Sequence, residues 1–95
     1  MYKLGTTKRF DKALKLCQKR GYPIAELKKA IALLVENGNL PSEYKPHILH
    51  GNHEGEWEAH IRPNWLLIWE QNYDELTLLM LTTGTHSDVF GKTRR

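Results

Sequence analysis

Residues 56–70 constrain the fold more than any other part of the chain. Polar and apolar residues alternate from position 56 to position 62, which is the two-residue period of a β-strand with one buried face. Pro63 and Asn64 follow, and this pair favours a tight turn because proline presets φ at its first central position. An apolar, β-rich run then occupies residues 65–69. The segment therefore predicts an antiparallel β-hairpin.

A two-residue loop in this hairpin would determine which side chains lie opposite one another. The expected pairs are Arg62 with Trp65, His60 with Leu67, and Glu58 with Trp69. One face of the sheet would then carry a carboxylate, an imidazole and a guanidinium in a row, flanked by two tryptophans. A plain solvated face does not need this combination, so we expect a functional site there.

The remaining elements follow from apolar periodicity and from helix-stop signals. Helices are expected over about residues 7–20 and 23–37, each followed by a glycine that can adopt the left-handed conformation. Short strands are expected over residues 2–6 and 47–49, and a strand buried on both faces over residues 75–83. We therefore predict a single α+β domain over residues 1–95. A short N-terminal strand precedes an antiparallel two-helix hairpin packed on one face of a mainly antiparallel sheet, in the order β-α-α-β-β-β-β.

Charge is distributed unevenly along the chain. Residues 1–46 hold ten Lys and Arg against four Asp and Glu, a net charge of +6, whereas residues 47–95 have a net charge of −3. Four lysines of the first helix line up opposite its apolar stripe: Lys8, Lys12, Lys15 and Lys19. No acidic residue occupies a position in this row, which favours a polyanionic partner such as RNA, although a solubilising surface would have the same composition.

Three features of the sequence indicate a cytoplasmic protein. No apolar run approaches the roughly 20 residues of a membrane span, and the N-terminus has no apolar stretch of the kind found in signal peptides. The single cysteine, Cys17, cannot form an internal disulfide, so a reducing compartment is expected. We expect no membrane partner.

Five histidines in 95 residues are the main candidates for chemistry. Three of them, His47, His50 and His53, have a spacing that suggests a metal-binding regulator, but a loop containing glycines does not align such residues as a helix does. Imidazole titrates near neutral pH, so general acid–base catalysis is the stronger interpretation. We expect no metal and no cofactor.

Three ordered segments, residues 44–51, 57–69 and 83–91, closely resemble the YafQ branch of the RelE-type toxins. The resemblance covers nearly the whole chain and implies a RelE-like fold. It implies the toxin of a type II toxin–antitoxin pair, a ribosome-dependent endoribonuclease that cleaves mRNA by activating the 2′-hydroxyl and so inhibits translation. The implied partners are a cognate acidic antitoxin, the ribosome and mRNA. The toxin alone would be monomeric, and with its antitoxin it would form a heterotetramer or a larger assembly.

The resemblance also implies roles for individual residues. The implied catalytic residues are His47, Glu58, His60 and His86. The resemblance also implies that Phe90 helps to place the substrate. From the residues themselves we expect further substrate contacts from Lys45, Arg62, Asn64 and Trp65, and binding of ribosomal RNA by the four lysines of the first helix.

Two positions depart from the family pattern. Asn64 stands where relatives often carry aspartate, and Thr82 where they carry an arginine thought to stabilise charge on the phosphate. Either another cation compensates, the candidates being Arg62, Lys45, Lys92, Arg94 and Arg95, or the activity is weaker, as in a ribosome-independent or degenerate member of the family. The alternative to an enzyme is a RelE-fold module that binds ribosomal RNA or a protein without cleavage, but such a module would not need the set of histidines.

Overall fold

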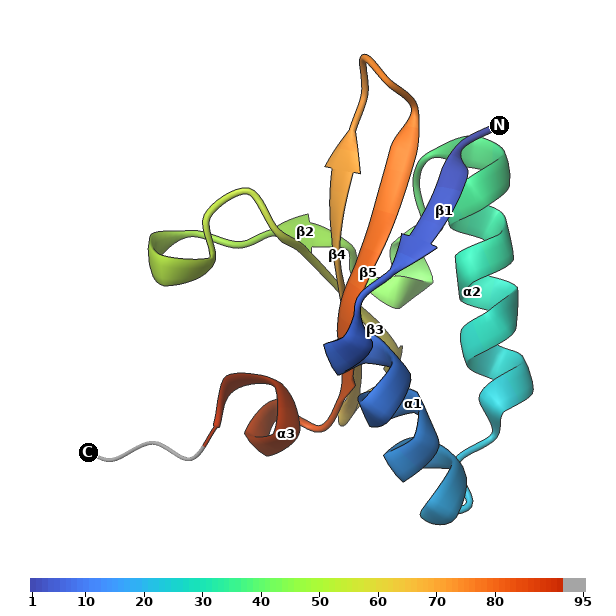
Figure 1. The fold of residues 1–95 in the computed structure, drawn as a ribbon, viewed down its shortest axis with the longest axis vertical. Coiled ribbons are helices and arrows are strands. Elements are labelled where there is room, and N and C mark those ends of the chain that lie inside the picture. Colours follow the sequence, from blue (N-terminus) through green and yellow to red (C-terminus); the bar gives the residue numbers. More distant parts are fainter. Residues whose placement is uncertain (92–95) are drawn as a thin grey trace.

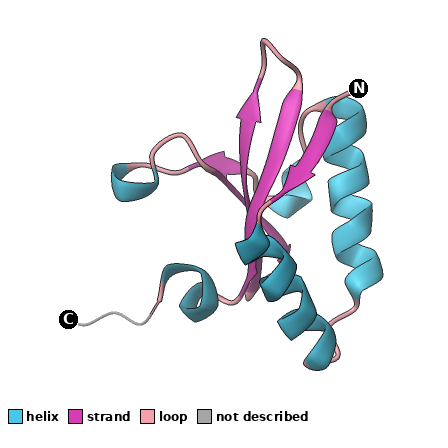
Figure 2. Ribbon diagram, viewed as in Figure 1, coloured by secondary structure: helices cyan, strands magenta, loops and turns pink. Residues whose placement is uncertain are grey.

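A five-stranded sheet forms the centre of the molecule in the computed structural model, which describes residues 1–91 (Figures 1 and 2). The strands are ordered β1-β5-β4-β3-β2; β1 runs parallel to β5 and the other neighbours are antiparallel. The elements are β1 (Lys3–Thr6), α1 (Lys8–Lys19), α2 (Ile24–Asn37), β2 (His47–Ile48), β3 (Trp57–Arg62), β4 (Trp65–Asn72), β5 (Thr77–Gly84) and α3 (His86–Phe90). Two single 3₁₀ turns, η1 (Ser42–Tyr44) and η2 (Gly51–His53), flank β2.

The predicted α+β architecture is confirmed. No helix within residues 1–91 is long and apolar enough to cross a membrane.

Local signals explain both long helices. The hydroxyl of Thr7 accepts a hydrogen bond from the backbone N–H of Phe10 at 3.0 Å, which caps α1. Gly38 ends α2 with φ of 74°, and its N–H donates to the carbonyl of Leu34 at 2.8 Å. A Cβ at Gly38 would also lie 2.6 Å from Tyr2, so glycine is required there for packing as well as for conformation.

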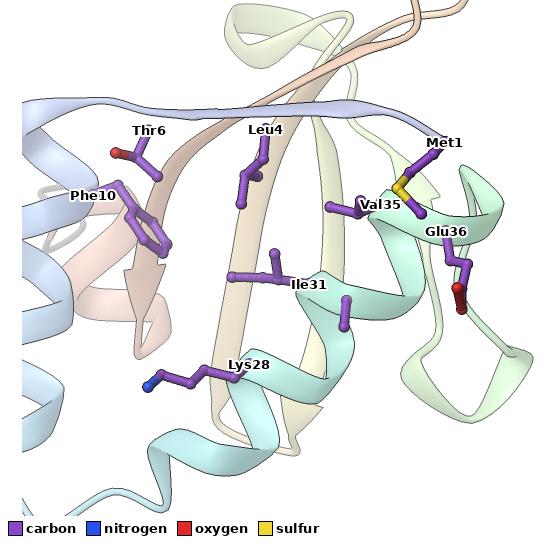
Figure 3. Close-up of a pocket in the computed structure, with 9 residues that line it drawn as sticks. Met1, Leu4, Thr6, Phe10, Lys28, Ile31, Val35 and Glu36 are labelled. Atoms are coloured by element: carbon purple, nitrogen blue, oxygen red, sulfur yellow. The ribbon is translucent and has the colours of Figure 1, made fainter.

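Both helices cover the same face of the sheet, as predicted, but they diverge from their junction instead of running side by side (Figure 1). The divergence leaves an apolar groove of about 510 Å³ between β1 and α2. In Figure 3, Leu4 of β1 and Ile31 of α2 face each other across this groove. It lies on the helix-covered side of the molecule.

The main core lies between this sheet face and the helices, and a smaller core lies on the opposite face. Trp65, Leu67 and Trp69 of β4 point toward the helices. The residues between them, Leu66 and Ile68, point the other way and pack with Val89 of α3. Residues 65–69 of β4 are therefore buried on both faces.

Strand β5 was expected to be buried throughout, and this prediction is wrong. Strand β5 begins at Thr77, and Leu76 before it lies in the turn with φ of 55°. Leu79 is exposed, because α3 covers only the half of the outer face near Val89.

A β-bulge at Ile61 changes the predicted register of the hairpin. Arg62 does pair with Trp65, but His60 lies opposite Leu66 and Glu58 opposite Ile68, so the two other predicted pairs are wrong. The bulge adds one residue to β3, and the strict alternation of faces therefore stops at His60. As a result, the two tryptophans of β4 lie on the helix-covered face and not beside the ionisable residues.

Candidate active site

All four predicted catalytic residues gather on the sheet face opposite α1 and α2. Glu58 and His60 project from β3, His47 comes from β2, and His86 begins α3. In Figure 1 this face lies between the 49–56 loop and α3, the two segments that extend to the left of the sheet.

The carboxylate of Glu58 is the centre of this cluster. Its Oε1 lies 3.1 Å from Nε2 of His47 and 3.7 Å from Nε2 of His60. The pairing of β2 with β3 puts His47 directly opposite Glu58, and His60 is two residues along the same strand on the same face. Glu58 is buried, and a buried carboxylate needs such partners because it has lost its hydration.

The orientation of His47 follows from its other nitrogen. Nδ1 lies 3.0 Å from the backbone carbonyl of Lys45, and a carbonyl only accepts, so Nδ1 carries a proton and donates. Nε2 is thereby directed at Glu58. Lys45 itself has φ of 50°, and this left-handed residue turns the chain from η1 into β2.

His86 approaches the cluster from α3. Its ring centroid is 6.1 Å from that of His60, with an interplanar angle of 75°. Its Nδ1 is 3.4 Å from Oδ1 of Asn64, a long contact across the site. Phe90 lies one helical turn further on, with its ring centroid 6.4 Å from that of His86.

Helix α3 is held in place by Arg9 of α1 and by Arg20, the C-cap residue of α1, neither of which the sequence analysis identified. Arg9 donates to the carbonyl of Val89 at 2.7 Å, and Arg20 contacts both carboxylate oxygens of Asp88 at 2.5 and 3.1 Å. The Arg20 guanidinium lowers the pKa of Asp88 to about 2, although partial burial acts in the opposite direction. A capping box between Thr85 and Asp88 completes the short helix.

A sequence signal for these arginines does exist. Arg9 and Arg20 are three helical turns apart and lie at the border between the apolar stripe and the lysine stripe of α1. That position predicts contacts at the edge of the core. It does not identify α3 as the partner.

Two predicted substrate-binding residues lie away from the site. Arg62, turned by the bulge, points to the helix side and pairs with Glu26 of α2 at 2.9 and 2.6 Å. Trp65 is 3% exposed and packs edge-on against Tyr22, so its ring has no free face on which a base could stack. Neither prediction agrees with the structure.

The remaining predicted residues have mixed outcomes. Thr82 is buried on the site face, because it pairs with Ile68 of β4, which in turn pairs with Glu58 of β3. Lys45 is exposed and lies two residues before His47. The compensating residues Lys92, Arg94 and Arg95 lie outside the described residues. All four lysines of the α1 stripe are exposed: Lys8, Lys12, Lys15 and Lys19. Their binding to RNA stays a prediction.

The sequence also suggested a metal site formed by His47, His50 and His53. Within residues 1–91, no group of three or more His, Cys, Asp or Glu side chains is placed to hold a metal ion. Cys17 is buried in the helix-side core, and burial raises the pKa of its thiol.

Residues 2–91 match the family model of YafQ, described as a bacterial toxin of type II toxin–antitoxin systems. The chain belongs to the YafQ toxin family. It is 41% identical over 83 residues to the mRNA interferase toxin YafQ of Escherichia coli K12, covering 86% of this chain and 88% of the relative. The resemblance inferred from the three sequence segments is confirmed.

Solved structures support the same family and fold. YafQ from E. coli BL21(DE3) superposes with a TM-score of 0.88 at 34% identity, covering 96% of this chain and all of that one. A chain of the E. coli DinJ–YafQ complex has a TM-score of 0.86 at 35% identity, with coverage of 96% and 100%. A metal-bound toxin from Helicobacter pylori also gives 0.86, at 34% identity, with coverage of 95% and 100%.

Proposed function

We propose that this chain is the toxin of a type II toxin–antitoxin pair and an endoribonuclease that cleaves mRNA on the ribosome. The observation that carries this proposal is the buried carboxylate of Glu58 between two imidazoles, with a third imidazole facing them from α3. The curated E. coli relatives are mRNA interferases, which supports the same reaction class here.

The reaction needs two proton transfers and stabilisation of charge. A base removes the proton of a ribose 2′-hydroxyl, the resulting oxygen attacks the adjacent phosphorus, and an acid protonates the departing 5′-oxygen. The products are a 2′,3′-cyclic phosphate and a 5′-hydroxyl, so protons and bonds balance without a further reactant. Each positioned acid or base contributes roughly 10² to 10⁴ in rate.

His60 fits the role of base and His86 that of acid. His60 is partly buried, and Glu58 at 3.7 Å can stabilise the positive charge that its ring gains on accepting the proton. His86 is exposed on the far side of the gap and can reach the leaving oxygen. Because attacking and leaving oxygens lie on opposite sides of phosphorus, an acid and a base on opposing elements suit the reaction.

The cation for the phosphate is assigned to Lys45. His47 lies 3.1 Å from the carboxylate of Glu58, and this carboxylate offsets any positive charge that the imidazole would present to the phosphate. Arg62 points away from the site, whereas Lys45 is exposed two residues before His47. Lys45→Gln should therefore lower kcat more than Arg62→Gln does.

RNA with a 5′-thio leaving group at the scissile bond gives the sharpest test. Sulfur leaves without protonation, so this substrate should restore cleavage by His86→Ala and should not restore cleavage by His60→Ala. His50→Ala, a change at an exposed histidine three residues after His47, is the matched control and should cleave both substrates normally. Rescue of His60→Ala in place of His86→Ala would reverse the assignment. Absence of cleavage by the parent chain, on ribosomes or off them, would refute the enzymatic function.

The partners follow from the same proposal. E. coli YafQ is found in a complex with DinJ, which supports a cognate antitoxin for this chain. A net charge of +6 over residues 1–46 favours an acidic antitoxin and ribosomal RNA as partners. A cytoplasmic location would give the toxin access to both.

A further inference from the structure

His53 forms the far end of a row of four rings across the candidate site. The ring centroids of His60 and His86 are 6.1 Å apart, and those of His86 and Phe90 are 6.4 Å apart. Phe90 and His53 follow at 5.1 Å, in an edge-on contact with 76° between their planes. This last contact joins the two segments that border the site, the 49–56 loop and α3.

His53 is held by its own loop. Its Nδ1 lies 3.1 Å from Oε1 of Glu56, and the carboxylate can only accept, so Nδ1 donates. The N–H of Glu56 donates to the carbonyl of His53 at 3.0 Å, and the carbonyl of Glu56 accepts from Leu49 at 2.7 Å. The imidazole therefore has a set position with respect to the end of β2.

Phe90 is held from the other side. Its neighbour Val89 is buried in the smaller core, and Arg9 binds the carbonyl of Val89. The Phe90 side chain itself remains 40% exposed. An aromatic ring placed between two imidazoles, yet open to solvent, is a suitable surface for an unstacked RNA base.

We propose that His53 is a positioning residue for the RNA substrate. With Glu56 it holds the ring of Phe90 edge-on and extends the aromatic surface on which a nucleotide next to the scissile phosphate stacks. His53 is three rings away from His60, so it acts on binding and not on proton transfer. The inference rests on the proposed RNA cleavage and names a further residue of that site.

The test measures binding and catalysis separately. Binding is followed by anisotropy with an RNA whose scissile 2′-hydroxyl is replaced by hydrogen, which prevents cleavage. His53→Ala should weaken this binding roughly tenfold, the size expected for losing part of a base-stacking contact. KM for cleavable RNA should rise similarly, with kcat within about twofold of the parent.

Matched variants distinguish the effect of the aromatic ring at position 53 from that of its hydrogen bond to Glu56 and from that of any change in the 49–56 loop. His53→Phe keeps the edge-on ring and should bind like the parent, and Glu56→Gln, which can still accept the hydrogen bond, should bind nearly as well. His50→Ala, in the same loop, should leave binding unchanged. Circular dichroism and thermal melting establish that each variant is folded.

The proposal fails if His53→Ala binds as tightly as the parent, or if its loss appears in kcat at constant KM. Failure of His53→Phe to restore binding, or an equal loss in His50→Ala, would also overturn it. Because the deoxy RNA is not cleaved, the binding result stands even if the parent shows no cleavage, in which case only the proposed function fails.

Discussion

Glu58 and His47 face each other across the β2–β3 ladder, with the carboxylate Oε1 3.1 Å from the imidazole Nε2. Strand β2 contributes only two residue pairs to the sheet, and one of them is the pair of His47 with Glu58. The main consequence of this short strand is therefore the position of His47. The same carboxylate oxygen lies 3.7 Å from Nε2 of His60, so one buried carboxylate lies close to two imidazoles.

Replacing Glu58 by glutamine should slow cleavage without unfolding the chain. Glutamine keeps the shape and can accept a hydrogen bond, but it cannot stabilise the charge that His60 gains in the reaction. We expect kcat to fall about 10²-fold, with KM little changed. Glu54→Gln, at an exposed glutamate of the 49–56 loop, should have parental kinetics. A Glu58→Gln variant with parental kcat would remove Glu58 from the mechanism.

Arg20→Gln should lower cleavage although Arg20 does not touch the site. It removes the contact that holds Asp88, so α3 and its His86 lose part of their anchoring. We expect kcat to fall roughly threefold to tenfold, of the order of 1 kcal/mol in barrier height. Arg62→Gln is the matched control, because it breaks a similar exposed pair with Glu26 on the other face. Equal effects of the two variants would contradict a special role for the α1–α3 contact.

The pair formed by Arg20 and Asp88 should also make stability depend on pH in acid. The pKa of Asp88 is lowered from 3.8 to about 2 in the folded chain, so the unfolded chain binds this proton at higher pH. The contribution of Asp88 to stability is therefore complete above pH 3.8 and is lost as pH falls toward 2. Melting temperatures of the parent and of Asp88→Asn, measured from pH 6 to pH 2, should converge at the acidic end. Curves that stay parallel would disprove this linkage.

Trp65→Ala should destabilise the fold by about 3 to 5 kcal/mol, as expected for deleting a large buried aromatic side chain. Its Nε1 donates to Thr83 Oγ1 at 2.9 Å, and that hydroxyl donates to the carbonyl of Leu66 at 2.6 Å. Trp65→Phe should keep most of the packing, fold, and bind the deoxy RNA like the parent. Chemical denaturation and anisotropy measure the two quantities. Weaker RNA binding by a stable Trp65→Phe would restore the rejected stacking role.

The lysine stripe of α1 should give ribosome binding a steep salt dependence. Changing all four lysines to glutamine removes up to four phosphate contacts, and the slope of log affinity against log salt should fall by roughly 3. Melting temperature should change little, because the side chains are exposed. The double change Lys28→Gln and Lys29→Gln on α2 is the control for basic charge elsewhere. An unchanged slope in the fourfold variant would exclude the stripe from ribosome binding.

Local signals in the sequence were sufficient for the elements and for part of the site. The caps and apolar stripes of the two long helices, and the turn at Pro63 and Asn64, were predicted correctly. The placement of His47 on a short strand was also correct. These features depend on backbone conformation and on which face of an element avoids water, and both can be read from neighbouring residues.

Only the tertiary structure decided which side chains meet in the site. The bulge at Ile61 turns Arg62 toward Glu26 on the helix side, and such an irregularity depends on long-range packing of the whole β3–β4 pair. The position of His86 depends on Arg20 at the C-terminal end of α1, 68 positions away from Asp88 in the chain. The sequence by itself determined the elements, their order and the histidines available for catalysis. Tertiary packing decided which faces those residues occupy, because a one-residue bulge and contacts between distant segments leave no periodic pattern in the sequence.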